Sequence, residues 1–221
     1  MFRKLHTGQN AWDIVTCTTC HLLIFIAVVA AIVFLLRRPL KKHKQYDLKV
    51  FQQLKPLQTP VNNRIMQAFT FLGKHQFLIP ANLLLIAVFY FFSSHHEYAL
   101  TILIISLSSL LLMLFLKKLF HRKRPETPLL FAAPGMSFPS GHAMMSVCFY
   151  GMLLHIFMLY PFSHGVQVAA VISCILLILL IGFSRVYLQV HYVSDVVAGF
   201  IIGVVWLYVA WQVLEKLGYI S

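Results

Sequence analysis

Six long apolar segments dominate this chain of 221 residues and constrain its fold more than any other feature. A helix needs about 20 apolar residues to cross about 30 Å of hydrocarbon. The segments near that length are Thr18–Leu36, Phe77–Phe92, Tyr98–Leu116, Phe138–Tyr160, Val166–Arg185 and Tyr192–Leu214. Hydrophobic residues make up 60% of the chain and charged residues 11%, which excludes a water-soluble globule. The sequence therefore predicts an all-α integral membrane protein, a six-helix bundle forming a single domain over residues 1–221.

The polar segment Arg37–Gln76, between the first two predicted membrane helices, carries helix signals of its own. Thr59 followed by Pro60 is typical of a helix start, and Gly73 of a helix end. Apolar residues recur at helical spacing in two stripes, Val50/Phe51/Leu54/Leu57 and Ile65/Met66/Phe69/Leu72. We expect two short amphipathic helices here, around Val50–Leu57 and over Pro60–Leu72. Their apolar stripes either rest on the membrane surface or pack against the bundle.

The formal net charge of +12 would suggest a nucleic-acid partner in a soluble protein. Membrane proteins instead keep Lys and Arg in loops near anionic lipid headgroups. We therefore predict the bilayer, and no nucleic acid, as the partner of these charges. Cys17 and Cys20 have the CxxC spacing, but no second pair accompanies them, so we assign them no metal or redox role.

Three short polar motifs stand at the ends of apolar segments, and six crossings place all three on one side of the membrane. They are Lys117…Arg124-Pro125, Pro139-Ser140-Gly141-His142 and Ser184-Arg185…His191…Asp195. Together they supply cations that suit phosphate oxygens, two imidazoles and a carboxylate. This set of groups suits a site that binds a phosphate group and attacks it.

Within the last motif, His191 and Asp195 are four residues apart and would meet on one face of a helix. A carboxylate that accepts the Nδ1 proton of a histidine leaves Nε2 with a free lone pair, as a metal ligand or a nucleophile. The alternative is an interfacial histidine beside a helix-starting acid. In the middle motif, Ser140 is a natural helix cap, Gly141 lets an anion approach free backbone N–H groups, and His142 could donate a proton there.

Together the motifs resemble the phosphatidic acid phosphatase type 2 superfamily, which also includes vanadium haloperoxidases and bacterial acid phosphatases. Its pattern, KxxxxxxRP, then PSGH, then SRxxxxxHxxxD, is matched at every position, within a motif-bearing core of about 113–206. The resemblance implies that His191 is a nucleophile that forms a phosphohistidine, that Asp195 orients it, and that His142 is the general acid. It also implies a set of phosphate-binding residues, namely Lys117, Arg124, Ser140, Gly141 and Arg185.

The resemblance further implies that no metal or other cofactor is needed, because protein cations stabilise the charge that grows on the phosphate oxygens. The shortage of acidic residues agrees with this. Only Asp47, Glu126 and Asp195 lie on the predicted active side. These are too few for a two-metal carboxylate site.

We therefore predict a metal-independent membrane phosphatase that hydrolyses the phosphomonoester or pyrophosphate of a lipid. Its substrate would be an amphiphilic phosphorylated lipid of the phosphatidic acid, phosphatidylglycerophosphate, prenyl pyrophosphate or lipid A class. One alternative is a lipid phosphotransferase that uses the same phosphohistidine. Another is a non-catalytic lipid-binding or transport protein, whose charges would lie mid-helix rather than at helix ends. A vanadate-dependent peroxidase shares the motifs but is expected to be soluble.

The basic residues and the family resemblance predict opposite orientations in the membrane. Of the 18 Lys and Arg residues, only Arg3, Lys4 and Lys216 lie on the face of the termini. The positive-inside rule would thus put the motifs in the cytoplasm. Membrane relatives in the family act on the extracytoplasmic or luminal side, and three of the basic residues are implied phosphate ligands. We predict a bacterial inner-membrane protein with its active site on the periplasmic side.

Overall fold

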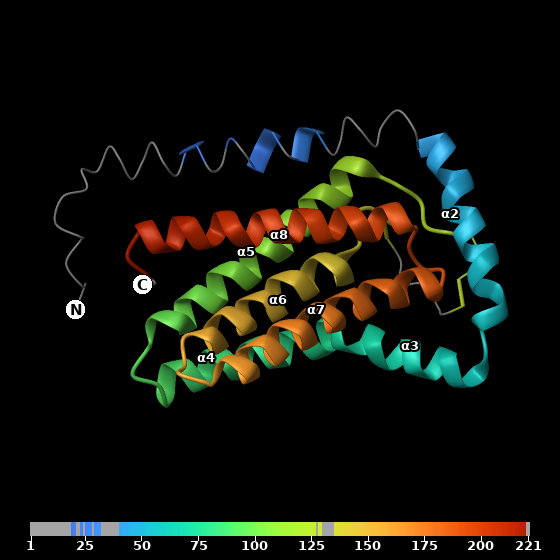
Figure 1. Ribbon diagram of the computed structural model, residues 1–221. Helices are drawn as coiled ribbons and strands as arrows, with labels where there is room; N and C mark the ends of the chain where they lie inside the picture. The colour runs from blue at the N-terminus through green and yellow to red at the C-terminus, as the bar shows by residue number, and fades with distance from the viewer. Residues whose placement is uncertain are drawn as a thin grey trace.

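The computed structural model describes residues 40–126, 128–129 and 135–219, together with scattered residues between 19 and 31. The helices are α2 (Leu40–Leu54), a 3-10 turn (Lys55–Leu57), α3 (Pro60–Leu72), α4 (His75–Phe91), α5 (Glu97–Phe120), α6 (Gly141–Met158), α7 (His164–Tyr187) and α8 (Val193–Lys216). Figure 1 shows α4 to α8 side by side, with α3 continuing from α4 and α2 lying across one end of the bundle. The prediction of an all-α membrane bundle is confirmed.

The count of six membrane helices is not exact. Within the described residues, five helical segments are long and apolar enough to cross a membrane. Four of them correspond to the last four predicted segments, and the fifth runs from Pro60 to Phe91. It is longer than the predicted Phe77–Phe92 because only Gly73 and Lys74 separate α3 from α4. The first predicted segment, Thr18–Leu36, lies largely outside the described residues, as does Cys17 of the CxxC pair.

The two helices expected before the second membrane helix are both present. Helix α3 has the predicted bounds, and the hydroxyl oxygen of Thr59 accepts a hydrogen bond from the Asn62 backbone N–H at 3.2 Å. Helix α2 begins at Leu40, ten residues before the apolar stripe that predicted it. The last two turns of α2 pack against the bundle, since Phe51 stacks on the Tyr192 ring at 6.0 Å between ring centroids.

The two apolar stripes are divided between the bundle and the surface. Buried members of the first stripe, Phe51 and Leu54, belong to a cluster with Val186 and Val196 of α7 and α8. In the second stripe, Met66 and Leu72 also pack against bundle residues. Leu57 and Ile65 remain exposed, at 52% and 44% of their surface. Packing against the bundle therefore accounts for most of the first stripe and for half of the second.

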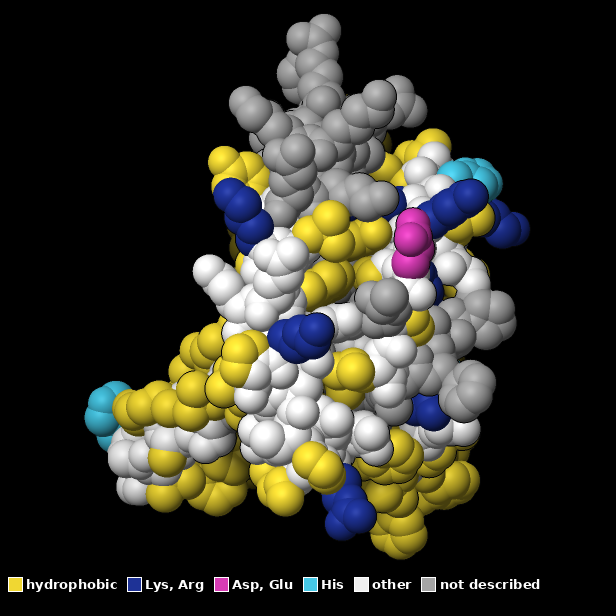
Figure 2. All heavy atoms as spheres, turned by 90° about the vertical axis from the view of Figure 1, so that its right-hand side faces the viewer, with side chains coloured by type: hydrophobic (Ala, Val, Ile, Leu, Met, Phe, Trp, Pro, Cys, Tyr) yellow, Lys and Arg dark blue, Asp and Glu magenta, His cyan; other side chains and the backbone are white. Residues whose placement is uncertain are grey.

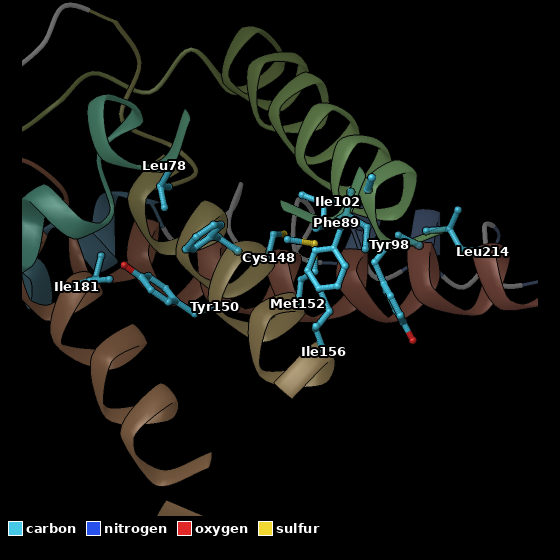
Figure 3. Packing of buried hydrophobic residues seen from close by; sticks show 14 residues of the cluster. Leu78, Phe89, Tyr98, Ile102, Cys148, Tyr150, Met152, Ile156, Ile181 and Leu214 are labelled. Carbon is cyan, nitrogen blue, oxygen red and sulfur yellow. The ribbon is translucent and has the colours of Figure 1, made fainter. Parts of the chain in front are cut away.

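The largest hydrophobic cluster lies among α4 to α8. Figure 3 shows its side chains, including Leu78 and Phe89 of α4, Ile102 of α5 and Met152 of α6. Ile102 and Met152 are fully buried. Burying apolar surface against other helices fixes their mutual positions, and so fixes the helix ends that carry the motifs.

Helices α6 and α8 approach closely because α8 carries glycine at the contact. A Cβ atom on Gly199 would lie 2.8 Å from the Ser140 carbonyl oxygen, and one on Gly203 would lie 3.0 Å from that of Met144. Neither position has room for a larger residue without moving the α6 backbone. The pair therefore forms the small-residue packing face typical of membrane helices.

Candidate active site

The three motifs meet at the end of the bundle across which α2 lies (Figure 1). The end of α5 supplies Lys117, the segment after it supplies Arg124, and α6 begins beside Ser140. Helix α7 ends just after Arg185, and His191 lies in the turn before α8. The Ser140 backbone N–H donates to the Asp195 carbonyl at 3.0 Å, which joins the starts of α6 and α8 directly.

Figure 2 looks onto this end of the molecule and shows Lys and Arg side chains spread over it, with an acidic side chain among them. Exposed residues at this end include Lys49, Lys55, Arg64, Lys123 and Glu126. The basic motif residues Lys117, Arg124 and Arg185 are instead buried or half-buried. The site is therefore an inner cationic group beneath a basic surface.

Four buried polar atoms from all three motifs have no hydrogen-bond partner among the described residues. They are Arg124 Nη1, Ser140 Oγ, His142 Nε2 and Arg185 Nε. A buried polar atom without a partner costs about 1–3 kcal/mol, and more when it is charged. Such atoms are rare in folded proteins. Four of them on residues of the three motifs therefore indicate a site for an anion that accepts hydrogen bonds.

Ser140 occupies the predicted cap position at the start of α6, but its side chain does not cap the helix. Only its backbone carbonyl takes part, by accepting the Met144 N–H at 3.1 Å. Ser140 is thus the N-cap residue of α6, as predicted, and its hydroxyl has no partner among the described residues. Gly141 follows directly, and a Cβ atom added to it would first meet the sulfur of Met113, at 3.4 Å. The backbone N–H groups of this first turn have no partner within the helix.

The basic residues are held by backbone carbonyls of the segment before α6. Lys117 Nζ donates to the Met136 carbonyl at 2.7 Å, and Arg124 Nε donates to the Gly135 carbonyl at 3.3 Å. These bonds fix one side of each cation. They leave Arg124 Nη1 directed elsewhere without a partner among the described residues.

His191 and Asp195 are brought together as their spacing predicts, although the contact is not a direct hydrogen bond. His191 Nδ1 lies 3.6 Å from Asp195 Oδ2, with only 1% of His191 and none of Asp195 exposed. Asp195 Oδ2 also accepts the Tyr192 backbone N–H at 3.0 Å and a short hydrogen bond from the Ser137 hydroxyl. Hydrogen bonds of this kind are often long in unliganded sites and tighten when substrate binds.

Ser137 is one of the residues that the sequence did not reveal as part of the site. Its hydroxyl oxygen lies 3.4 Å from His191 Nδ1 as well as bonding to Asp195. The side chain is fully buried. It stands three residues before Ser140, outside every motif position. Ser137 thus bridges the histidine and the carboxylate.

Burial lowers the pKa of His191 from its ordinary 6.5 to about 4. The positive charges of Arg185 and Arg124 act in the same direction, whereas Asp195 opposes it. His191 is therefore neutral across the physiological pH range. A neutral imidazole whose Nδ1 faces a carboxylate presents a lone pair on Nε2.

Arg122 and Asp47 form a second group that sequence reasoning missed. Arg122 Nη1 donates to Asp195 Oδ1 at 2.6 Å, and Arg122 Nη2 donates to Asp47 Oδ2 at 3.1 Å. In the sequence, Arg122 is one of several basic residues between Lys117 and Arg124, and Asp47 lies far from every motif. Neither position carries a local signal that could have identified it.

Thr70 of α3 is the third missed contributor. Arg185 Nη1 donates to Thr70 Oγ1 at 3.1 Å, and Thr70 Oγ1 lies 2.6 Å from Ser184 Oγ. Ser184 uses its proton on the Ile181 carbonyl at 2.6 Å, so Thr70 donates to Ser184. Arg185 thus donates to Thr70, Thr70 to Ser184, and Ser184 to the Ile181 carbonyl. This chain of hydrogen bonds fixes the Arg185 guanidinium from outside the motif. Ser184 therefore supports Arg185 rather than facing an anion itself.

The carboxylates of the site are engaged by cations. Asp47 and Asp195 both bind Arg122. In the part of the chain that the structure describes, no three His, Cys, Asp or Glu side chains are placed to hold a metal ion. The unpaired hydrogen-bond donors of the site suit an anion.

Comparison with known proteins agrees with this geometry. The model of the PAP2 superfamily matches residues 98–219. Phosphatidylglycerophosphatase B of Bacillus subtilis is 31% identical over 162 residues, which cover 73% of this chain and 79% of that protein.

Two solved structures are similar in fold. A transmembrane PAP2-type phosphatidylglycerolphosphate phosphatase from Bacillus subtilis superposes with a TM-score of 0.75 at 27% identity, covering 90% of this chain and 96% of the other. Aquifex aeolicus LpxE superposes with a TM-score of 0.57 at 25% identity, covering 76% and 94%. The resemblance drawn from the motifs is confirmed, and the chain belongs to the PAP2 superfamily.

Proposed function

We propose that this membrane phosphatase removes the phosphate group of a phosphorylated lipid through a phosphohistidine on His191, without a metal ion. The observation that carries the proposal is the set of four buried polar atoms without a partner among the described residues, on Arg124, Ser140, His142 and Arg185. They come from all three motifs at the same end of the bundle. A phosphate group accepts hydrogen bonds on every oxygen and would satisfy all four.

In the first step, His191 Nε2 attacks phosphorus as the bond from phosphorus to the lipid oxygen breaks. His142 gives its Nε2 proton to that oxygen, so that the lipid leaves as an alcohol. Positive charge develops on the His191 ring, and Asp195 stabilises it from the Nδ1 side. Lys117, Arg124 and Arg185 stabilise the charge on the equatorial phosphate oxygens.

In the second step, water attacks the phosphohistidine. His142, now neutral, accepts a proton from that water, and the bond from phosphorus to Nε2 breaks to release inorganic phosphate. His142 and His191 both return to their starting states.

A lipid substrate suits a site at the end of a membrane bundle, because its tail remains in the bilayer while its phosphate reaches the helix ends. Phosphatidylglycerophosphate is the first candidate, since two similar proteins are named for it. We further propose an inner-membrane protein whose site faces the periplasm.

The test is an assay of the purified protein in vesicles, with phosphatidylglycerophosphate, phosphatidic acid, a prenyl pyrophosphate and lipid A phosphate supplied in parallel. We expect phosphate release that persists in excess EDTA and is inhibited by orthovanadate, which imitates the five-coordinate transition state. His191→Ala should lower kcat by several orders of magnitude.

Activity that EDTA removes and Mg²⁺ restores would contradict the metal-independent mechanism. Transfer of phosphate to added glycerol in preference to water would instead identify a phosphotransferase. A His191→Ala variant that keeps its activity would remove the phosphohistidine from the mechanism.

A further inference from the structure

Helix α2 places a buried acidic side chain against the start of α8, where Asp195 also lies. Asp47 is only 3% exposed, although its neighbours Tyr46 and Leu48 are 63% and 44% exposed. Its Oδ2 atom accepts from Arg122 Nη2 at 3.1 Å and from the Ser194 hydroxyl at 3.1 Å. A buried carboxylate is costly unless it is paired, so the pairing holds α2 against the start of α8.

Arg122 joins this carboxylate to the one beside His191. Its Nη1 atom donates to Asp195 Oδ1 at 2.6 Å and to the Ser194 hydroxyl at 2.8 Å. The guanidinium carbon lies 4.2 Å from the centroid of the Tyr192 ring, a distance at which the ring attracts a cation. The planar fork of an arginine can hold two carboxylates at fixed angles, as a lysine cannot.

The charges in this group decide what Asp195 can do for His191. If Arg122 paired with Asp195 alone, the pair would be neutral and Asp195 would be a weak partner for an imidazolium. Asp47 shares the guanidinium, so the group of Asp47, Arg122 and Asp195 carries one net negative charge. That charge lies on the Nδ1 side of His191, through Asp195 Oδ2 at 3.6 Å.

We propose that Asp47 and Arg122 are positioning residues for the His191–Asp195 pair, with Asp47 giving the group of Asp47, Arg122 and Asp195 a net negative charge that faces the histidine. The inference rests on the phosphohistidine mechanism proposed above. The other groups that act on His191 are Arg185, Arg124 and His142, all of which disfavour its positive form. The carboxylates supply the opposing charge that lets the ring become positive in the transition state.

The experiment compares Asp47→Asn with wild type, and uses Glu126→Gln as a matched control that removes an exposed carboxylate from the same end of the molecule. For Asp47→Asn we expect kcat to fall about 10- to 100-fold, as is typical when a residue that supports a functional side chain through another group is lost. KM should change less than about threefold, because the phosphate ligands stay in place. The acidic limb of kcat/KM should move to lower pH, because less negative charge favours the neutral imidazole.

A rescue variant separates charge from folding. Ser194 touches both Asp47 and Arg122, so Asp47→Asn with Ser194→Asp returns a carboxylate to the guanidinium from α8 instead of α2. We expect this double variant to recover at least about tenfold in kcat and to restore the acidic limb. Arg122→Lys, which keeps the charge but loses the fork, should lower kcat and move the same limb even if Asp47→Asn cannot be purified in a folded form.

Each outcome has a separate meaning when melting curves in detergent accompany the kinetics. Asp47→Asn or Arg122→Lys with wild-type kcat and an unmoved acidic limb would overturn the inference. So would a loss of kcat that follows the loss of folded protein, leaves the limb unmoved and is not rescued by Ser194→Asp. Failure of the proposed function appears differently, as a wild-type protein without lipid phosphatase activity or a His191→Ala variant that retains it.

Discussion

Thr70 accepts a hydrogen bond from Arg185 at 3.1 Å, although the two residues stand 115 positions apart. Thr70 lies in the last turn of α3, and Arg185 lies in the last turn of α7. Because a guanidinium can only donate, its orientation is set by where its acceptors lie. The acceptor here comes from the helix that precedes the motif-bearing core.

Thr70→Val should therefore weaken phosphate recognition while leaving the motif intact. Removing the acceptor leaves Arg185 free to rotate away from the site, and a hydrogen bond to a charged group is worth about 1.5–3 kcal/mol. We expect kcat/KM to fall about tenfold or more. Thr70→Ser retains the hydroxyl and should stay near wild type. Equal losses in the Val and Ser variants would show that packing, not the hydrogen bond, is responsible.

Ser137→Ala should lower kcat by about tenfold, because the hydroxyl that bridges His191 and Asp195 is lost and a buried acceptor loses a donor. Steady-state kinetics on a lipid phosphate would measure it. Ser109→Ala is the matched control, since Ser109 is also fully buried and its hydroxyl donates to the Ser106 carbonyl of α5, away from the motifs. If both variants behave alike, Ser137 has no special part in the site.

Stability should fall with acid in a way that depends on His191. The folded protein does not protonate this residue until about pH 4, whereas the unfolded chain does so near its ordinary pKa of 6.5. The unfolded state therefore binds the extra proton between these values, and stability that is complete above pH 6.5 is lost progressively down to about pH 4. The integrated effect is about 3 kcal/mol. Melting curves of wild type and His191→Asn between about pH 4 and 8 should diverge, and parallel curves would contradict the low pKa.

The same low pKa bears on activity. In the proposed mechanism His191 attacks in its neutral form, so its contribution to kcat/KM should be complete above about pH 5.5. Any decline toward alkaline pH then belongs to the loss of the proton that His142 donates. His142→Ala should flatten that alkaline decline and should slow lipid phosphates more than p-nitrophenyl phosphate, whose leaving group needs little protonation. Equal losses on both substrates would exclude His142 as the general acid.

The orientation in the membrane can be decided with one cysteine. Glu126 is exposed at the active end, so Glu126→Cys, with the four native cysteines replaced by serine, places a thiol there. We expect it to react with an impermeant maleimide added to intact cells. Labelling only after lysis would put the site in the cytoplasm, as the basic-residue count suggests.

The sequence was sufficient for features that depend on local signals. Helix α3 was predicted with the bounds it has because Thr59, Pro60 and Gly73 mark its ends within a few residues. The motif residues were found because their spacing is fixed by the ends of membrane helices. The first part of α2 was missed because residues 40–49 are mostly polar and carry no apolar stripe.

The supporting residues of the site could not be predicted in the same way. Asp47 and Thr70 matter only because α2 and α3 fold back onto the ends of α8 and α7, and nothing in their neighbourhood in the sequence reports that contact. Ser140 shows the reverse case. Its place as the N-cap residue of α6 was predicted from the sequence, but its hydroxyl makes no hydrogen bond to the helix, which leaves a donor for the site.

The glycine contact between α6 and α8 makes the starts of these two helices a rigid unit. The Ser140 N–H bond to the Asp195 carbonyl and the close approach of Gly199 lock the two helix starts at the level of the backbone. His142 at the start of α6 and Asp195 at the start of α8 should therefore keep a fixed separation. The amides of α2 and α3 should exchange with deuterium faster than those at the start of α6.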